Sequence, residues 1–282
     1  MTIALPRPES RRLTLRRPRP GIAAALIVLA LVGTAVAWPA LFAGDPLAAD
    51  PLHVLQAPSA AHWFGTDQLG RDVFGRVVHG ARHSLSIGVA ATVIAVGAGI
   101  LLGLLAGLTH RYADEALSRG FDALAAFPLV LLALLFIAIA GTGTTSLIVA
   151  IGIATLPHYA RVVRAQTLVV RQAPYVTHAV AFGASRTRLV LRHVLPNVLG
   201  PIPVLAMIGL GEAVLIAAGL SFLGLGPQPP SPEWGAMLSE GRGYLHIAWW
   251  ASVLPGAAVT ATVISLTVIG RHLQGRFEGR HQ

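Results

Sequence analysis

The chain has 282 residues, of which 54% are hydrophobic and only 12% are charged, whereas roughly a quarter of residues are charged in an ordinary soluble protein. This composition excludes a soluble globular domain and indicates a polytopic membrane protein. Cys is absent, which excludes disulfides and thiolate metal sites, and every basic residue is Arg. Because a P-loop needs a lysine, the chain cannot be a P-loop ATPase by itself.

Six apolar segments of about the length that a bilayer requires follow one another along the chain. They are residues 21–42, 84–108, 122–140, 145–159, 198–223 and 248–269. The first follows a tail with six Arg, but it is too long for the apolar part of a signal peptide, and Trp38-Pro39 replaces a small-residue cleavage site. We therefore expect an all-α membrane protein with about six spans, the first of them uncleaved.

The positions of the arginines predict the orientation. With the N-terminus inside, the cytoplasmic segments are 1–20, 109–121, 158–197 and 270–282, and they hold 17 Arg. The external segments, 43–83 and 224–247, hold only 4. The positive-inside rule then places both termini in the cytoplasm.

The chain divides into four parts on this basis. They are a basic tail (1–20), a first transmembrane helix with an external amphipathic loop (21–83), a five-helix core (84–270) and a second tail (271–282).

The internal segment 158–197 carries six Arg and no acid. Pro174 can serve as the first residue of a short helix, because its missing N–H costs nothing there. Gly183 can end that helix in a left-handed conformation, and Ser185 can cap a second helix. We expect the second helix to run from Arg186 until Leu195-Pro196 redirects the chain into the fifth span.

The short helix has an apolar stripe. Tyr175, Ala179 and Phe182 fall at i, i+4 and i+7, and Val176 with Val180 widens the stripe. A two-turn helix between membrane spans cannot bury such a face alone. It either lies on the lipid surface or docks into a groove of a partner.

The run PYVTHAVAFGASRTRLVLRHVLPN, residues 174–197, resembles the EAA loop of bacterial ABC-importer permeases. Gly183, Leu195 and Pro196 fall in register with that pattern, and Ala179 matches its second Ala. Thr177 and His178 stand where the family has Glu and the first Ala. The resemblance implies that this loop couples to an ATPase, through the following residues: Tyr175, Val176, Thr177, His178, Ala179, Phe182, Gly183 and Pro196.

Two external segments narrow the resemblance to the dipeptide/oligopeptide/nickel permease family, in its C-type subunit. One is HWFGTDQLGRDVFGR followed by GARHSL (62–85), and the other is LSFLGLGPQPP through WGAML (220–238). The similarity runs from about residue 20 to residue 270. The residues of the first motif are Gly65, Thr66, Asp67, Gly70, Arg71, Asp72 and Arg76.

The resemblance implies a type I ABC importer permease fold in a bacterial inner membrane. The chain would be a non-catalytic subunit that forms half of the pathway of an ATP-driven importer of di- or oligopeptides. Its partners would be a second permease subunit in a heterodimer, two ATP-binding subunits, an extracytoplasmic solute-binding protein and membrane lipid, with no nucleic acid. The chain itself would bind no cofactor, because ATP and Mg²⁺ would be on the ATPase subunits.

Three alternatives remain open. A permease for nickel or another small solute would share the same motifs. An intramembrane enzyme would need paired acids, an HExxH motif or a serine with a base inside the spans, and none is found. A self-contained channel would not need an unpaired basic loop with a short apolar helix.

Residues 69–81 form an amphipathic pattern, with Arg71, Asp72, Arg76 and His79 opposite the apolar face. This pattern predicts a helix along the outer membrane surface, which either braces the first two spans or receives a delivering binding protein.

Glu212 is the only acid deep within a span. An intramembrane acid suggests function by default. It is either a hydrogen-bonded packing residue beside Gly209 and Gly211, or a pathway or gating residue together with Ser221. The eleven histidines show no metal-binding spacing, so no metal site is expected.

Overall fold

A computed structural model describes residues 20–37 and 44–278. Within these ranges the secondary structure is helical, apart from one isolated β-bridge between Thr66 and Asp72. The α-helices are α1 (Pro20–Ala37), α2 (Val73–Leu108), α3 (Arg111–Ala125), α4 (Leu129–Ala140), α5 (Thr144–Val170), α6 (Pro174–Ala181), α7 (Arg186–Leu189), α8 (Leu195–Val198), α9 (Ile202–Phe222), α10 (Trp234–Gly241) and α11 (Trp250–Glu278). Short 3-10 turns (Pro51–His53 and Arg242–Tyr244) and a π-helical turn (Val190–Val194) complete the set.

Four helices, α2, α5, α9 and α11, are long and apolar enough to cross a membrane. α3 and α4 together meet the same requirement, but they are bent by 93° at the break between them. The third predicted segment thus contains a sharp bend, and residues 111–121, expected as a cytoplasmic loop, are helical. α1 is a shorter apolar helix, and residues 38–43 of the first predicted segment lie outside the described residues.

The centre of the fold is the contact between α2 and α5, which glycines make possible. Gly99, Gly103 and Gly107 of α2 face α5, and a Cβ on Gly103 would lie only 2.6 Å from the carbonyl oxygen of Ala160. Small residues at one-turn spacing allow two backbones to approach closely, as membrane helices require. α9 and α11 pack beside this pair, and α10 packs on α9 and α11.

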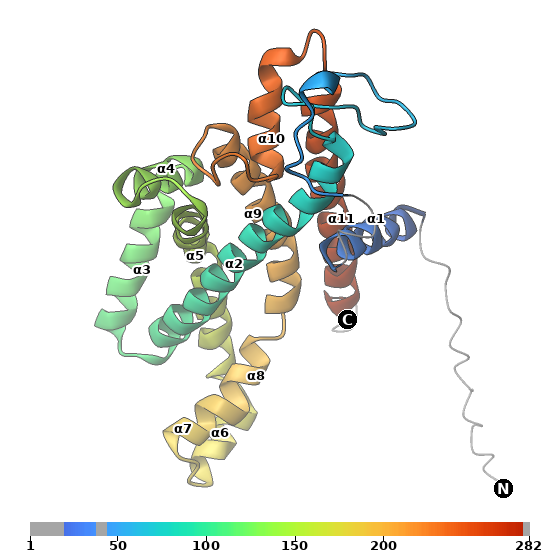
Figure 1. The fold of residues 1–282 in the computed structure, drawn as a ribbon. Helices are drawn as coiled ribbons and strands as arrows, with labels where there is room; N and C mark the ends of the chain where they lie inside the picture. The colour runs from blue at the N-terminus through green and yellow to red at the C-terminus, as the bar shows by residue number, and fades with distance from the viewer. Residues whose placement is uncertain (1–19, 38–43, 279–282) are drawn as a thin grey trace, which may run out of the picture.

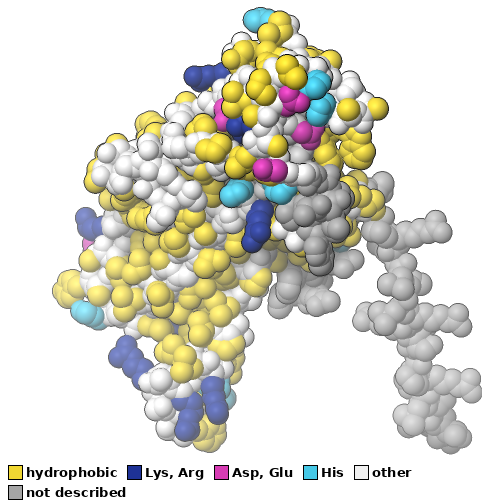
Figure 2. Space-filling model, in the orientation of Figure 1, with side chains coloured by type: hydrophobic (Ala, Val, Ile, Leu, Met, Phe, Trp, Pro, Cys, Tyr) yellow, Lys and Arg dark blue, Asp and Glu magenta, His cyan; other side chains and the backbone are white. Residues whose placement is uncertain are grey.

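The molecule has two ends with different chemistry. Figure 1 shows α6, α7 and α8 together at one end, and α10 with residues 44–72 at the other. Figure 2 shows a largely apolar surface between the ends, with arginines near the α6–α8 end and acids and histidines near the α10 end. This distribution matches a body that crosses lipid and presents polar groups on both sides.

Two expectations are wrong. α2 is one continuous helix that begins directly after its N-cap, Asp72, so the amphipathic stretch is the first part of a span and not a separate surface helix. Its apolar residues Val73, Val77 and Ala81 pack in a core cluster with Trp234 of α10, which removes the need for a lipid surface. The predicted boundary at residue 83 therefore falls inside α2.

The second wrong expectation is that Leu195-Pro196 redirects the chain, which it does not. α8 begins at Leu195 directly after a π-helical turn, in which the N–H of Leu195 donates to the carbonyl oxygen of Val190. The wider turn accommodates Pro196, which cannot donate a backbone hydrogen bond. The chain turns into α9 only after Leu199, where Gly200 and Pro201 follow.

Candidate functional site

The exposed tip of the α6–α8 end is built by local capping. Pro174 is the first residue of α6, as predicted, and Ser185 caps α7. Gly183 has φ +78°, and the N–H of Gly183 donates to Val180 (2.9 Å) while that of Ala184 donates to Ala179 (3.0 Å). This pair of bonds is a Schellman motif, which fixes the turn between α6 and α7.

The two faces of α6 differ. Val176 is only 3% exposed and packs with Val163, Val194 and Val198, so it anchors α6 on the chain's own core and is not part of a free face. Phe182 is 91% exposed and Val180 is 55% exposed. The remaining coupling residues of the tip divide as follows: Tyr175, Thr177, His178 and Gly183 are exposed, and Ala179 is half-buried.

Arginines fasten this tip to the C-terminal end of α2. Arg171 donates to the carbonyl oxygen of Gly107 (2.8 Å) and Arg186 to that of Leu108 (3.1 Å). The last carbonyls of a helix lack intrahelical partners and carry the negative end of its dipole, so guanidinium groups stabilise them. Arg164 pairs with Asp114 of α3. Arg171 and Arg186 thus position the tip, and Arg164 joins α5 to α3.

The α10 end contains the external motif, and this motif is a buried scaffold. Gly65 (φ +70°) and Gly70 (φ +72°) adopt left-handed conformations that favour glycine. The hydroxyl of Thr66 accepts from the N–H of Gln56 (2.8 Å), and Trp250 donates to the carbonyl oxygen of Thr66 (3.0 Å). The motif therefore ties residues 53–72 to α11.

An ion network lies beneath this loop. Arg71 and Arg76 are 3% and 1% exposed, and both donate to Asp67, at 2.7 and 2.6 Å. Both also donate to Glu240 of α10, each at 2.8 Å. Two guanidiniums and two carboxylates thus balance their charges and join the loop, α2 and α10. Arg71 and Arg76, expected on the polar outer face of this segment, are instead buried, whereas Asp72 and His79 are partly exposed.

A third carboxylate, Glu233, also joins α2 to α10. Glu233 is fully buried, caps α10 by accepting from the N–H of Ala236 (2.9 Å), and accepts from the hydroxyl of Ser84 (2.9 Å). The indole of Trp234 donates to the carbonyl oxygen of Val77 (2.8 Å). These bonds make the α10 end one rigid unit with the start of α2.

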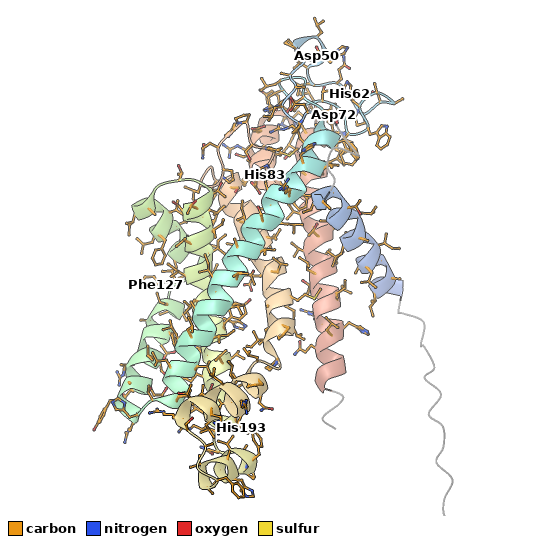
Figure 3. All side chains as sticks on the ribbon, turned by 60° about the horizontal axis from the view of Figure 1, so that its bottom comes forward. Asp50, His62, Asp72, His83, Phe127 and His193 are labelled. Atoms are coloured by element: carbon orange, nitrogen blue, oxygen red, sulfur yellow. The ribbon has the colours of Figure 1, made fainter. Side chains whose placement is uncertain are left out.

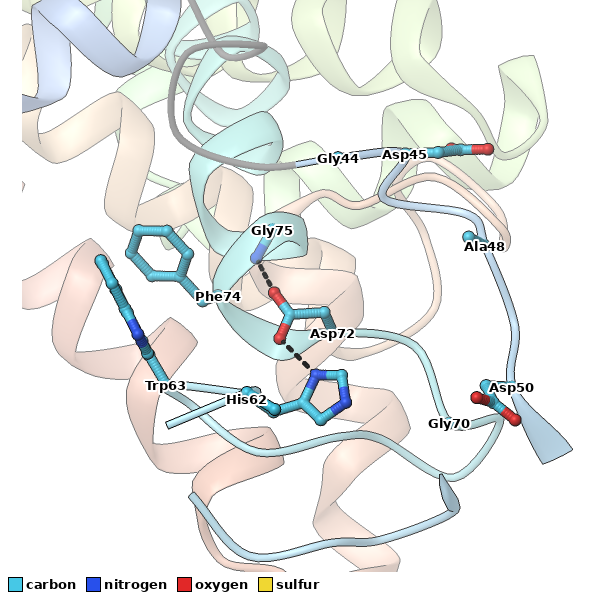
Figure 4. A pocket seen from close by; sticks show the side chains of 11 residues that line it. Gly44, Asp45, Ala48, Asp50, His62, Trp63, Gly70, Asp72, Phe74 and Gly75 are labelled. Atoms are coloured by element: carbon cyan, nitrogen blue, oxygen red, sulfur yellow. Dashed lines mark hydrogen bonds and ion pairs between the residues drawn. The ribbon is translucent and has the colours of Figure 1, made fainter. Parts of the chain in front are cut away.

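A pocket of about 470 Å³ opens on this end. Figure 4 shows Asp72 between His62 (3.1 Å) and the N–H of Gly75 (2.6 Å), with Trp63 and Phe74 beside them. Asp50 also lines the pocket, and a hydrogen bond from His53 lowers the pKa of its carboxyl group. Each of these carboxylates already has a local partner, and no group of three metal-ligating side chains is present among the described residues.

The two predicted pathway residues lie apart. Ser221 is buried where α9 meets α10, with Gly226 and Gly235 packed against it, so it belongs to the packing of the α10 end. Glu212 is exposed and lines a cleft of about 460 Å³ between the α3–α4 break, α5 and α9. Figure 3 shows Phe127, another residue of this cleft, at the α3–α4 break, well away from His193 at the α6–α8 end.

The comparison with known families decides the identity. A family model described as "Binding-protein-dependent transport system inner membrane component" matches residues 99–280. The chain belongs to this family. This permease is therefore an inner-membrane subunit of a bacterial ABC importer, a multi-pass protein with the type I permease fold.

Several curated relatives resemble the permease over most of their length. The dipeptide transport system permease protein DppC of Alkalihalophilus pseudofirmus is 40% identical, with 92% of this chain and 86% of the relative covered. The probable D,D-dipeptide permease DdpC of Escherichia coli K12 is 41% identical, with 88% of this chain and 84% of the relative covered. The glutathione permease GsiD of Escherichia coli O6:K15:H31 is 41% identical, with 92% of this chain and 86% of the relative covered.

A solved structure supports the fold. The permease superposes on a chain of the MetNI methionine ABC transporter with a TM-score of 0.57 and 19% sequence identity, and the match covers 72% of the permease and 96% of that chain. At this identity the likeness concerns the fold alone.

Sequence reasoning missed several residues that the permease brings together. Glu240 completes the ion network from a position far along the chain. The only available signal was that Arg71 and Arg76 lie close together in an external segment that also holds acids. Tyr159 and Phe127 line the Glu212 cleft, and their apolar surroundings in the sequence gave no signal for this.

Proposed function

We propose that this permease forms half of the translocation pathway of an ATP-driven importer of di- or oligopeptides. The named solutes of three relatives that are 40–41% identical support this, because a dipeptide, a D,D-dipeptide and glutathione are all short peptides or peptide-like. These three solutes differ in backbone chemistry, but each is small and carries an amino group and a carboxylate.

The observation that carries the coupling role is the exposed apolar tip of α6 and α7. Phe182 and Val180 lie outside the chain's own core, while Val176 and the Schellman turn hold the tip rigid. An exposed aromatic side chain on a preorganised helix turn is a typical anchor for a partner's groove. We assign that partner as an ATP-binding subunit on the cytoplasmic side.

The remaining subunits follow from the same proposal. ATP and Mg²⁺ bind to two separate ATPase subunits, since this chain has no lysine for a P-loop. A second permease chain supplies the other half of the pathway, and an extracytoplasmic solute-binding protein delivers the peptide to the α10 end. Closure of the ATPases moves the α6–α7 tip, and the spans rock between inward and outward openings.

Transport by the reconstituted complex tests the proposal. The permease is purified with its second permease chain and its ATPase subunits, and is placed in proteoliposomes with ATP on the ATPase side. The binding protein is added on the other side with radiolabelled dialanine or Ni²⁺. We expect ATP-dependent accumulation of the peptide and none of the metal ion. Accumulation of Ni²⁺ without peptide would contradict the proposed substrate class.

A further inference from the structure

One carboxylate lies at the centre of a membrane-spanning helix. Glu212 is the midpoint of α9 (Ile202–Phe222). At 1.5 Å per residue it lies about 15 Å from either end of the helix, near the middle of a hydrocarbon core about 30 Å thick. Among residues 20–37 and 44–278, no hydrogen bond or ion pair reaches its exposed side chain. A charge at this depth is costly unless it meets a partner or a water-filled cavity.

The cleft in front of Glu212 is shaped by two helices in close contact. A Cβ on Gly209 would overlap the hydroxyl group of Tyr159, so this glycine lets the tyrosine lie against α9. α5 and α9 are neighbours in the fold, and both Tyr159 and Glu212 line the cleft. Thr155, one turn before Tyr159 on α5, lines the same cleft. A carboxylate, a phenol and a hydroxyl therefore converge at the depth where the pathway of a transporter usually holds its solute.

Glu212 gives the wall of the cleft a carboxylate, and the exposed His158 lines the same cleft. Arg161 also lines it, but its guanidinium donates to Asp122 (2.8 Å), so this arginine does not neutralise Glu212. The ring of Phe127 is 56% exposed in the wall, whereas Tyr159 is only 3% exposed and lies behind it against α9. Aromatic faces attract ammonium groups, and a carboxylate next to them supplies the counter-charge. The volume, about 460 Å³, fits a solute the size of a dipeptide.

We propose that this cleft binds the protonated amino group of the transported peptide, with Glu212 as its counter-ion and the exposed ring of Phe127 beside it. The proposal rests on the peptide-import function. It assigns the recognition of the peptide's amino group to the side of the pathway that holds Glu212. The rival occupant is a basic side chain of the second permease chain, which would bury Glu212 in a permanent interface.

Thiol chemistry tests the charge of the cleft, because the chain has no native cysteine. Thr155→Cys is assembled into the full complex and reacted with two methanethiosulfonate reagents, the cationic trimethylammonium-ethyl and the anionic sulfonato-ethyl compound. We expect the cationic-to-anionic rate ratio to fall roughly fivefold or more when Glu212→Gln is added, since a nearby unit charge changes local concentration by about that factor. Glu115→Gln, which removes an exposed acid of α3 that pairs with Arg119, is the matched control and leaves the ratio unchanged.

Protection tests the ligand. We expect dialanine to slow the modification of Thr155→Cys several-fold, and N-acetyl-dialanine, which lacks the amino charge, to have no effect. Equal protection by both peptides, protection by neither, or a ratio insensitive to Glu212→Gln would overturn the proposal. Failure of both reagents to react in the assembled complex would also overturn it, because the second permease chain would then cover the cleft. If Glu212→Gln does not assemble, the comparison of the two peptides decides alone.

The proteoliposome assay separates this proposal from the import function. Selective protection by dialanine with no uptake by the wild-type complex would contradict peptide import but retain the amino-group site. Uptake of dialanine without selective protection would contradict the amino-group site but retain peptide import.

Discussion

At the scale of single residues, the ion network under the external motif carries the greatest energetic consequence. Asp67 accepts from Arg71 and Arg76, and all three side chains are almost completely buried. A buried ion pair contributes little net stability, but removal of one partner leaves an uncompensated charge. The network therefore specifies how the loop, α2 and α10 fit together, and it cannot tolerate the loss of one member.

We predict that Asp67→Asn lowers the free energy of unfolding by about 3 kcal/mol, because two buried guanidiniums would then share Glu240 alone. The measurement is the midpoint of thermal unfolding of the purified protein in detergent. Glu115→Gln breaks the exposed pair with Arg119, which should cost less than about 1 kcal/mol. Equal effects of the two substitutions would show that the network is not buried as described.

At the scale of helices, the permease depends on close approach at particular glycines. A Cβ on Gly103 would lie 2.6 Å from the carbonyl oxygen of Ala160, whereas Gly97 of the same helix has nothing within 4 Å of an added Cβ. We predict that Gly103→Ala destabilises the protein by about 1–3 kcal/mol through overpacking against α5. Gly97→Ala should be neutral or stabilising by up to about 1 kcal/mol through helix propensity. Unfolding midpoints of the two variants measure this, and a greater loss in Gly97→Ala would contradict the packing.

The short helix α6 gives a second prediction at this scale. Gly183 has φ +78° with nothing within 4 Å of an added Cβ, so any effect of a side chain there comes from backbone strain alone. Gly183→Val should therefore loosen the turn between α6 and α7 without affecting the spans. Hydrogen exchange should show faster exchange at Ala184, whose N–H closes the Schellman motif, with unchanged protection in α5. Unchanged exchange at Ala184 would contradict this.

The helices also show what the sequence could predict. Pro174, Gly183 and Ser185 act within a few residues of their own positions, so the ends of α6 and the start of α7 were predictable. The pairing of Arg76 with Glu240 was not, because Glu240 approaches Arg76 through the packing of α10 on α2. The 93° bend between α3 and α4 was also missed, since an apolar run gives length but not direction.

At the scale of the whole molecule, the two polar ends predict a topology. Single cysteines at Ala60 and Gly243, both exposed at the α10 end, should react with an impermeant reagent on intact cells. Cysteines at Glu115 and Val180 should react only after the membrane is permeabilised, because the positive-inside rule places them in the cytoplasm. Reaction of residue 180 on intact cells would reverse the orientation. Gly235 is buried, so it is a poor reporter although it lies in an external segment.

The central claim is that separate ATPases drive this permease through the exposed tip of α6 and α7. The most direct measurement is the amount of ATPase subunit that co-purifies with the Phe182→Asp variant. Phe182 is 91% exposed, so the substitution should leave folding and membrane insertion intact. A charge in an apolar anchor site should cost binding a few kcal/mol, enough to reduce co-purification at least tenfold. Trp63→Ala, which removes an exposed aromatic ring at the opposite end, is the control and should retain the ATPase. Full recovery of the ATPase with Phe182→Asp would contradict the account.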